Sequence, residues 1–329
     1  MAKVVVTGVA GLLGAHLSRH LLAAGHDVIG IDSLFGGYIE NVHPQVKFYH
    51  VDLENGKAVD TVFKGTNPDY VFHFAAYAAV GLSPYIRNFN YRNNVLCSAN
   101  IVNACVNHNV KKIIFTSSMD VYGDNAAPFT EDQKPSPTDP YGIAKYTVEQ
   151  DLKSANHYFG LPYSIIRPHN VIGMYQNLWD RYRNVIGIWI RKILNNEPIT
   201  IFGDGTQRRA FSDVYYYMKP FAQLMYNHDS EIFNIGADQD IQILEAAKAL
   251  QKVARNLGYN PDIVHLEPRV EVHTMYCNHD KAKGMLDFND GTDLEKMMDQ
   301  MLRWAVTQPN REVKKMEYEI EKNMYSFWK

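Results

Sequence analysis

The sequence predicts an α/β protein with a doubly wound parallel sheet and a smaller, mixed α/β second part. Two observations predict it. Short β-branched runs alternate with helix-period segments through the first half of the 329 residues, and this rhythm ends after about Arg167. Strands that alternate with helices favour a parallel sheet covered on both faces. We expect one domain over 1–168 and another over 169–329, with part of 207–245 packing back on the first.

The strands of the first half can be placed from their β-branched runs, and the first helix from Leu13, Leu17 and Leu21, which recur every four residues before Gly25. Shorter strands and one amphipathic helix, 292–307, are expected in the second half. The segment 311–329 is charged and aromatic, and the sequence assigns it no role. The expected strands are Lys3–Thr7, Asp27–Asp32, Val46–His50, Tyr70–Phe74, Val110–Thr116, Tyr163–Arg167, Ile199–Phe202, Ile232–Ile235 and Ile263–Leu266.

Composition excludes several classes of protein. Hydrophobic residues make up 46% and charged residues 21%, which excludes a disordered chain, a coiled coil and a collagen-like fibre. A net charge of −3 argues against nucleic-acid binding over a whole face. The apolar stretch 71–82 is shorter than the ~20 residues of a membrane span. With 3 cysteines and no signal-peptide pattern, we expect a cytoplasmic protein that binds no membrane.

A glycine loop follows the first expected strand and opens the first helix. Gly8, Gly11 and Gly14 allow a tight turn, close approach of a pyrophosphate and close helix packing. Asp32, at the end of the second strand, can accept hydrogen bonds from an adenosine ribose and would repel a 2′-phosphate. This pattern predicts a Rossmann-type sheet that binds NAD rather than NADP. Asp52 and Leu53, after the third strand, are candidates for contact with the adenine.

Tyr141 and Lys145 are the candidate catalytic pair. Four residues apart on a helix, they share a face, but Tyr215/Lys219 and two further pairs repeat that spacing. Only Tyr141 lies in the nucleotide-binding half, after a strand that ends in hydroxyl residues. A free tyrosine has a pKa of about 10, and a nearby ammonium favours its phenolate. A Ser or Thr hydroxyl at that strand end can hold the oxygen of an alcohol substrate.

Several motifs in order resemble the extended short-chain dehydrogenase/reductases, most of all the nucleotide-sugar epimerase/dehydratase branch typified by UDP-glucose 4-epimerase. The resemblance covers nearly the whole chain and is strongest over 1–170. It implies tightly bound NAD, a nucleotide-sugar substrate, and Ser118, Tyr141 and Lys145 as catalytic residues, with Tyr141 as the base. The motifs are the three glycines, Asp32, Phe72-His73-Phe74-Ala75-Ala76, Ser117-Ser118-Met119-Asp120-Val121-Tyr122-Gly123 and Tyr141-Gly142-Ile143-Ala144-Lys145.

The resemblance also implies which residues contact each ligand, and a homodimer formed through helices 93–108 and 141–158. UDP is the expected carrier of the sugar, with dTDP, GDP and CDP as alternatives. Besides Tyr141 and Lys145, the expected cofactor contacts are Gly8, Gly11, Leu12, Leu13, Gly14, Asp32, Asp52, Leu53, Phe74, Ala75 and Ala76. The expected substrate contacts are Ser118, Asp120, Asn170, Asn184, Phe202, Arg209 and Arg269. Of these, the resemblance implies that Asn184 starts a helix that touches the phosphates, that Phe202 lies beside the base, and that Arg209 and Arg269 bind the diphosphate.

The reaction is less clearly indicated than the family. Dehydratases of this branch carry Asp-Glu after the catalytic Thr, whereas this chain has Met119-Asp120, and Met119 cannot protonate a leaving hydroxyl. We therefore expect 4-epimerisation through a transient 4-keto sugar. Decarboxylation by Asp120, net oxidation with release of NADH, and a non-catalytic NAD-binding role remain alternatives. His273, Cys277 and His279 lie close in sequence, but their spacing matches no zinc motif, so we expect no metal.

Overall fold

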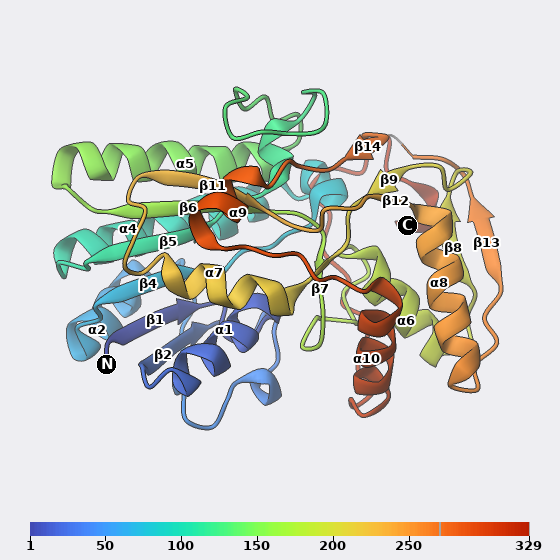
Figure 1. Ribbon diagram of the computed structural model, residues 1–329, viewed down its shortest axis with the longest axis horizontal. Coiled ribbons are helices and arrows are strands. Elements are labelled where there is room, and N and C mark those ends of the chain that lie inside the picture. Colours follow the sequence, from blue (N-terminus) through green and yellow to red (C-terminus); the bar gives the residue numbers. More distant parts are fainter. Residues whose placement is uncertain (270, 329) are drawn as a thin grey trace.

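The computed structural model describes residues 1–269 and 271–328 and has two unequal parts (Figure 1). The larger part is built on a seven-stranded sheet in the order β11-β6-β5-β4-β1-β2-β3. Every neighbouring pair of strands in it is parallel. The predicted doubly wound sheet is thereby confirmed. Its strands are β1 (Lys3–Thr7), β2 (Asp27–Asp32), β3 (Lys47–His50), β4 (Tyr70–His73), β5 (Lys112–Thr116), β6 (Tyr163–Pro168) and β11 (Glu231–Ile235).

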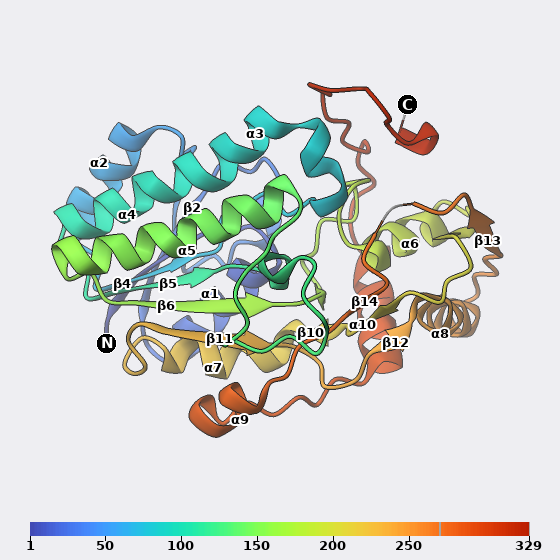
Figure 2. The same cartoon turned by 90° about the horizontal axis from the view of Figure 1, so that it is seen from above.

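Helices cover both faces of this sheet, as Figure 2 shows from above. One apolar cluster joins the sheet to α2, α4 and α5, and a second joins its other face to α1, α7 and α9. Since both faces are covered, the central strands are apolar without alternation: Val4, Val5 and Val6 are all fully buried. The helices are α1 (Leu12–Ala23), α2 (Gly56–Thr66), α3 (Arg87–Tyr91), α4 (Cys97–Asn107), α5 (Pro140–Phe159), α7 (Met218–Gln223) and α9 (Asp280–Leu286).

One edge strand of the sheet, β11, comes from the second half of the chain and pairs with β6; it lies within 207–245, the stretch expected to pack back on the first domain. One other strand departs from what the sequence suggested. The strand β5 begins at Lys112 rather than at Val110. The reason is local: Asn109 has a positive φ of 53°, and the Val110 N–H bonds to the Cys105 carbonyl at the end of α4. Val110 therefore belongs to the turn between helix and strand.

The smaller part packs three helices against short strands around its own apolar cluster. The amphipathic helix expected over 292–307 is confirmed as α10, where the side chain of Asp293 caps the helix by accepting the Lys296 N–H. The elements are α6 (Val185–Leu194), α8 (Ile243–Asn256) and α10 (Leu294–Val306), with the strands β7 (Val171–Ile172), β8 (Ile199–Phe202), β9 (Arg208–Arg209), β10 (Ser212–Asp213), β12 (Ile241–Gln242), β13 (Ile263–Leu266) and β14 (Thr274–Met275).

The described residues contain no helix that is both long enough and apolar enough to span a membrane. After α10, the chain turns back across the molecule to a short 3₁₀ helix, Ser326–Trp328, which lies near α6 and β13 in Figure 2. We call residues 311–328 the C-terminal strap. Its side chains contact both parts of the molecule.

Candidate active site

A cavity of about 1220 Å³ lies where the carboxyl ends of the parallel strands face the smaller part. In parallel α/β sheets, ligands bind at this edge. The structure brings all the expected site residues together, since every one of them lines this cavity. They are Gly8, Gly11, Leu12, Leu13, Gly14, Asp32, Asp52, Leu53, Phe74, Ala75, Ala76, Ser118, Asp120, Tyr141, Lys145, Asn170, Asn184, Phe202, Arg209 and Arg269.

The glycine loop leaves room for a dinucleotide because side chains are missing from it. Gly8 has a φ of +70°, and a Cβ there would lie 2.8 Å from the Ala75 backbone nitrogen. A Cβ on Gly14 would overlap the Gly8 carbonyl, so α1 packs directly on the loop. Gly11, the N-cap of α1, offers no side-chain cap, which leaves backbone N–H groups of the first turn free for a pyrophosphate. This cradle fits NAD.

A buried hydrogen-bond network holds the end of β4 against the glycine loop. The Thr7 hydroxyl accepts the N–H groups of Phe74 and Ala75, both at 3.1 Å, and lies 2.8 Å from Nδ1 of His73. Burial lowers the pKa of His73 to about 3, so its imidazole is neutral and bonds through its other nitrogen to Ser98 at 2.9 Å. The network fixes the wall formed by residues 74–76.

Asp32 ends β2 at the place expected for a ribose contact. Its carboxylate accepts the Ala10 N–H at 3.0 Å and the Leu34 N–H at 2.8 Å, so both oxygens are oriented. Burial raises the pKa of Asp32, and these backbone bonds oppose that shift. Asp52 is exposed, and its carboxylate accepts the Glu54 N–H at 2.9 Å. Of the two, Asp32 is the better placed to accept further hydrogen bonds within the cavity.

Tyr141 and Lys145 are presented by the first turns of α5. Asp139 caps this helix, accepting the N–H groups of Tyr141 and Gly142, and Pro140 occupies its first position. Further along α5, Glu149 forms a buried, two-pronged ion pair with Arg167 of β6, at 2.9 and 2.6 Å. The cap and the ion pair fix α5 on the sheet, and with it both candidate catalytic side chains.

The protein alone does not favour a Tyr141 phenolate. Burial raises the pKa of Tyr141 above its usual value; the Asp120 carboxylate adds to this shift, and the neighbouring Ser118 hydroxyl opposes it. Burial also lowers the pKa of Lys145 to about 7, although the nearby Glu149 carboxylate opposes that shift. The Lys145 ammonium nitrogen lies 5.9 Å from the centre of the Tyr141 ring and donates to the Thr116 carbonyl at 2.7 Å. A Tyr141 phenolate would therefore need a further positive charge beside it.

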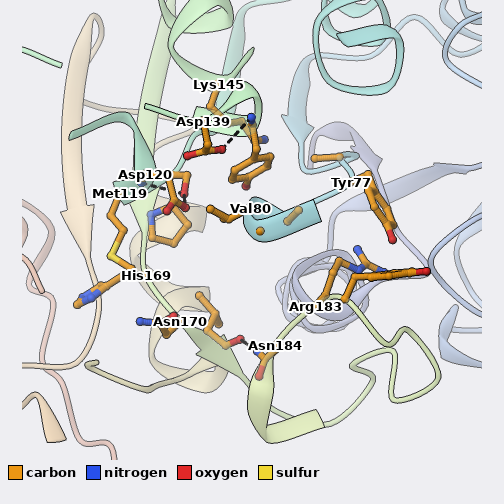
Figure 3. A pocket seen from close by; sticks show the side chains of 18 of the residues that line it. Tyr77, Val80, Met119, Asp120, Asp139, Lys145, His169, Asn170, Arg183 and Asn184 are labelled. Atoms are coloured by element: carbon orange, nitrogen blue, oxygen red, sulfur yellow. Dashed lines mark hydrogen bonds between the residues drawn. The ribbon is translucent and has the colours of Figure 1, made fainter. Parts of the chain in front are cut away.

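Ser118 and Asp120 form a hydrogen-bonded pair beside Tyr141. The Ser118 hydroxyl donates to the Asp120 carboxylate at 2.6 Å and accepts the Asp120 N–H at 3.2 Å, which leaves one lone pair to accept a substrate hydroxyl. Burial raises the pKa of Asp120 to about 6, and Asp139 adds to the shift. Figure 3 shows Asp120, Asp139 and Lys145 close together on one side of the cavity, with Arg183 and Asn184 away from them.

Two of the expected substrate contacts, Asn170 and Arg269, have buried polar atoms without partners among the described residues. The Asn170 amide nitrogen and the Arg269 Nε are buried and make no hydrogen bond to any residue of 1–269 or 271–328. Buried donors of this kind are normally satisfied, so a ligand is the natural partner for them. Asn170 has a positive φ of 41°, which turns the chain after β6.

Two other expected substrate contacts are already occupied. Asn184 begins α6 as expected, but its side chain caps that helix by accepting the Ile186 N–H and donates to the Val171 carbonyl. The Arg209 guanidinium donates to the Glu271 carboxylate at 2.9 Å and to main-chain carbonyls, including that of Val272. Arg209 and Asn184 are therefore positioned by the protein itself and have less capacity left for a ligand.

Several residues of the cavity were missed in the sequence. Arg183 lines it, with its guanidinium 4.9 Å from the centre of the Tyr77 ring and paired with the buried Asp180 at 2.9 Å. Glu271 pairs with both Arg209 and Arg269. Only Asp139, directly before Pro140, carried a local signal, that of a helix cap. The others depend on contacts between distant segments.

The His/Cys group considered for a metal is separated in the fold. His279 lies 2.9 Å from the buried His169, whose ring points away from the other labelled side chains in Figure 3. His273 instead lies 3.3 Å from the Thr206 hydroxyl, and Cys277 packs in an apolar cluster. Within residues 1–269 and 271–328, no group of three or more His, Cys, Asp or Glu side chains is arranged to hold a metal ion.

Comparison with known proteins places this chain among sugar-nucleotide enzymes. Residues 4–236 match the model of the NAD dependent epimerase/dehydratase family. A curated relative, the putative UDP-glucose 4-epimerase of Methanocaldococcus jannaschii, is 32% identical, and the match covers 92% of this chain and 97% of that protein.

Two solved structures extend this likeness to the whole fold. UDP-glucose 4-epimerase of Thermotoga maritima, solved with UDP-glucose, is 31% identical with a TM-score of 0.86, over 92% of this chain and 98% of that one. UDP-N-acetylglucosamine 4-epimerase of Methanobrevibacter ruminantium, in complex with UDP-N-acetylmuramic acid, is 30% identical with a TM-score of 0.85, over 94% and 99%. The resemblance expected from the sequence is confirmed, and a non-catalytic role is set aside. The chain is therefore an NAD-dependent enzyme that belongs to the NAD-dependent epimerase/dehydratase family, within the epimerase branch of the extended short-chain dehydrogenase/reductases.

Proposed function

We propose that this enzyme interconverts the two C4 epimers of a UDP-sugar through a transient 4-keto sugar. The observation that carries the proposal is the order of groups along one cavity. The glycine loop and Asp32 lie at one end, Ser118 and Tyr141 lie at strand and helix ends next to them, and the arginines 209 and 269 line the substrate half. A nucleotide sugar laid along the cavity puts its sugar at Tyr141 and its diphosphate near the guanidinium groups, which bind phosphates well.

Each catalytic side chain has a separate task in this proposal. Tyr141 takes the proton from the sugar hydroxyl at C4 and later returns it to the ketone oxygen. Ser118, whose own proton points to Asp120, accepts a hydrogen bond from that hydroxyl and fixes its position. Lys145 supplies positive charge that favours the Tyr141 phenolate. Bound NAD supplies the hydride acceptor and donor and a second positive charge. Asn170 and Arg269 donate to the sugar or its diphosphate.

Epimerisation also requires the ketone to turn over between the loss and the return of hydride. The protein must therefore bind the nucleotide tightly while it makes few contacts to the sugar, so that the sugar can rotate. The distribution of donors in the cavity supports this division. The arginines gather in the substrate half, whereas Ser118 and Tyr141 are the principal groups expected at the reacting hydroxyl.

Decarboxylation of a UDP-uronic acid is the second candidate, because Asp120 is a buried carboxyl group in contact with Ser118. Its pKa of about 6 makes it competent to give or take a proton near neutral pH. An epimerase has no evident need of this carboxylate, which by its charge disfavours the Tyr141 phenolate. The second candidate therefore rests on Asp120 alone.

The test is incubation of the purified enzyme with UDP-glucose, UDP-galactose, UDP-N-acetylglucosamine and UDP-glucuronate, without added NAD. Products are identified by proton NMR and mass spectrometry. The proposal expects a 4-epimer of unchanged mass from at least one of these sugars. Loss of carbon dioxide from UDP-glucuronate would instead establish the second candidate. Continuous release of NADH, or no product from any of the four, would contradict the proposal.

We further propose a cytoplasmic homodimer that forms through α4 and α5. Large apolar side chains are exposed along and beside these two helices: Leu96, Ile143, Tyr158 and Phe159, the last two at 74% and 69% exposure. The three cysteines are free and buried, which suits a reducing compartment. Light scattering that gives the mass of a monomer would overturn the dimer.

A further inference from the structure

Four lysine or arginine side chains of the described residues line the cavity, and three of them have a place in the proposed function. Lys145 lies beside Tyr141, and Arg209 and Arg269 lie in the substrate half. The fourth, Arg183, has no assigned task. NAD and a UDP-sugar each bring a doubly charged diphosphate into the cavity. The two arginines of the substrate half can pair with one of them, which leaves the pyrophosphate of NAD without a basic side chain.

Arg183 reaches the cofactor end of the cavity although it belongs to the loop before α6. One terminal nitrogen of its guanidinium lies 3.4 Å from the Gly36 carbonyl, and a Cβ on Gly36 would come within 2.9 Å of that nitrogen. The next residue, Gly37, packs so closely on the glycine loop that a Cβ there would overlap the Ala10 backbone. Only the segment 36–37 therefore separates the guanidinium from the loop that cradles the pyrophosphate.

The Tyr77 ring lies against the same guanidinium. Tyr77 directly follows the wall of residues 74–76, and its ring centre is 4.9 Å from the guanidinium carbon of Arg183. Figure 3 shows these two side chains together, away from Lys145. The Tyr77 hydroxyl is buried and makes no hydrogen bond to residues 1–269 or 271–328. Arg183 thus contacts both segments that flank the glycine loop, the one that follows β2 and the one that follows β4.

The Arg183 guanidinium is fixed at one edge and open at the other. Its Nε donates to the buried Asp180 carboxylate at 2.9 Å, and Asp180 in turn accepts the Tyr182 N–H at 2.9 Å. Apart from the long contact with Gly36, the two terminal nitrogens make no hydrogen bond to residues in the described part of the chain. A guanidinium oriented in this way can donate two parallel hydrogen bonds to a phosphate.

The C-terminal strap supports this arrangement from outside. The Lys314 N–H donates to the Trp179 carbonyl at 2.9 Å, in the loop that carries Arg183. The Lys314 ammonium donates to the Phe35 carbonyl at 2.7 Å, in the segment that the guanidinium contacts. One residue of the strap therefore ties the loop of Arg183 to the wall of the cofactor end. This gives a structural task to a segment to which the sequence assigned no role.

We propose that Arg183 binds the pyrophosphate of NAD together with the glycine loop. The N–H groups at the start of α1 belong to the larger part, whereas Arg183 belongs to the smaller part, so both parts of the molecule hold the cofactor. This inference goes beyond the proposed function, because it requires only that the enzyme binds NAD. It does not depend on which UDP-sugar is converted.

The charge of Arg183 acts on groups at two separate positions along the cofactor. Burial raises the pKa of Asp32, at the expected ribose contact, and the pKa of Tyr141, at the catalytic position; in both cases the positive charge of Arg183 opposes the shift. In NAD the pyrophosphate lies between the adenosine ribose and the nicotinamide. A cation that acts on both ends of the dinucleotide is well placed for the group between them.

The experiment follows exchange of bound NAD in the purified full-length holoenzyme. The protein is incubated with an excess of deuterium-labelled NAD, and mass spectrometry of the cofactor released on denaturation gives the exchange rate. Hydrogen bonds to a charged group are among the strong ones and their loss appears mostly in the dissociation rate, so Arg183→Ala should exchange NAD about tenfold faster or more. Arg183→Lys keeps the charge without the planar fork and should exchange at an intermediate rate.

Arg87→Ala is the matched control for this change. The Arg87 guanidinium lies 5.8 Å from the centre of the Tyr91 ring, much as Arg183 lies over Tyr77, but Arg87 is exposed and does not line the cavity. The control should exchange NAD at the wild-type rate.

A double variant separates loss of the phosphate contact from damage to the fold. Removal of Arg183 alone leaves the buried Asp180 carboxylate without its partner, which can destabilise the protein. Asp180→Asn/Arg183→Met removes both charges, and the amide introduced at position 180 can still accept the Tyr182 N–H. This variant should exchange NAD as fast as Arg183→Ala does.

Calorimetric titration of the same holoenzymes with UDP separates the cofactor from the substrate. The Kd for UDP should be the same in Arg183→Ala as in the wild type. Exchange of NAD at the wild-type rate in both Arg183→Ala and the double variant would overturn the inference. Weaker binding of UDP in those variants, with unchanged exchange of NAD, would assign Arg183 to the substrate instead. Equally fast exchange in Arg87→Ala would show a general loosening of the protein and would also overturn the inference.

Discussion

The two ends of the cavity are built in different ways. At the cofactor end, the loop of residues 8–14 and Asp32 lie within one βαβ unit, and hydrogen bonds within the protein orient the Asp32 carboxylate and the neighbouring wall at Phe74. At the nucleotide-sugar end, Phe202, Arg269 and the strap come from three distant segments, and buried donors on Asn170 and Arg269 have no partner in the part of the chain that the structure describes. The first end is held in shape by hydrogen bonds within the protein, whereas the second keeps donors that a ligand can satisfy.

This comparison predicts which substitutions lower the rate of the chemical step, which weaken binding of NAD and which weaken binding of the sugar nucleotide. Tyr141→Phe should have the largest effect, because it removes the proposed base between the two ends. General acid–base catalysis typically contributes 10²–10⁴-fold, so we expect kcat to fall by about a thousandfold with the NAD content unchanged. Initial rates of epimerisation measure the effect.

Tyr215→Phe is the matched control for this change, because Tyr215 and Lys219 have the same spacing. Tyr215 is 71% exposed, and no role in the cavity is assigned to it. The control should retain full activity. Wild-type turnover by Tyr141→Phe would remove Tyr141 from the chemistry.

Gly14→Val should weaken the binding of NAD at the cofactor end. Its Cβ would overlap the Gly8 carbonyl, so α1 must move away from the loop that holds the pyrophosphate. Overpacking typically costs 1–3 kcal/mol, so NAD affinity should fall roughly 5- to 150-fold. Measurement of NAD released from the denatured protein checks this expectation. Gly65→Ala, where an added Cβ meets nothing within 4 Å, should keep its full NAD content. Full NAD content in Gly14→Val would mean that close packing of α1 on the loop is not required.

Arg269→Ala should weaken only the binding of the sugar nucleotide at the other end of the cavity. Loss of a hydrogen bond to a charged group costs about 1.5–3 kcal/mol, so KM for the UDP-sugar should rise by roughly 10- to 150-fold. The NAD content should be unchanged, since Arg269 lies in the substrate half. Steady-state kinetics with the exposed Arg255→Ala as the control separate the two effects. A loss of NAD together with the rise in KM would show that the two ends are not independent.

Asp120→Asn should have the smallest effect on epimerisation, a shift of the pH profile. The Asp120 carboxylate raises the pKa of Tyr141, so its removal lowers that pKa and moves the rise of activity to lower pH. The difference from the wild type should vanish below about pH 6, where Asp120 of the wild type is itself protonated. A pH–rate profile measures the shift. A rise that moves to higher pH would reverse the proposed electrostatics, and complete loss of activity would make Asp120 an acid–base group.

The same contrast explains what could be predicted from the sequence. Gly8, Asp32 and Tyr141 were found because each lies next to a strand end in a pattern set by its immediate neighbours. The alternation of strands and helices likewise predicted a parallel sheet and the positions of its strands along the chain up to β6. Local patterns suffice where a site is built from consecutive elements.

Long-range contacts account for what could not be predicted. Arg183 lies in a crowded aromatic and polar run that shows no periodicity, and its place in the cavity depends on a buried Asp180 and the ring of Tyr77. Asn184 was expected to touch phosphate, yet its side chain is used to cap α6. Phe327 contacts Phe202 only because the strap returns across the molecule. None of these contacts has a signature within a short window of sequence.

The central claim is that Tyr141 moves a proton while the hydride at C4 never leaves the enzyme. The most direct test is epimerisation of UDP-galactose in heavy water without added NAD, followed by proton NMR. The account predicts UDP-glucose that retains full protium at C4. Deuterium at C4, or conversion that requires added NAD at every turnover, would contradict it.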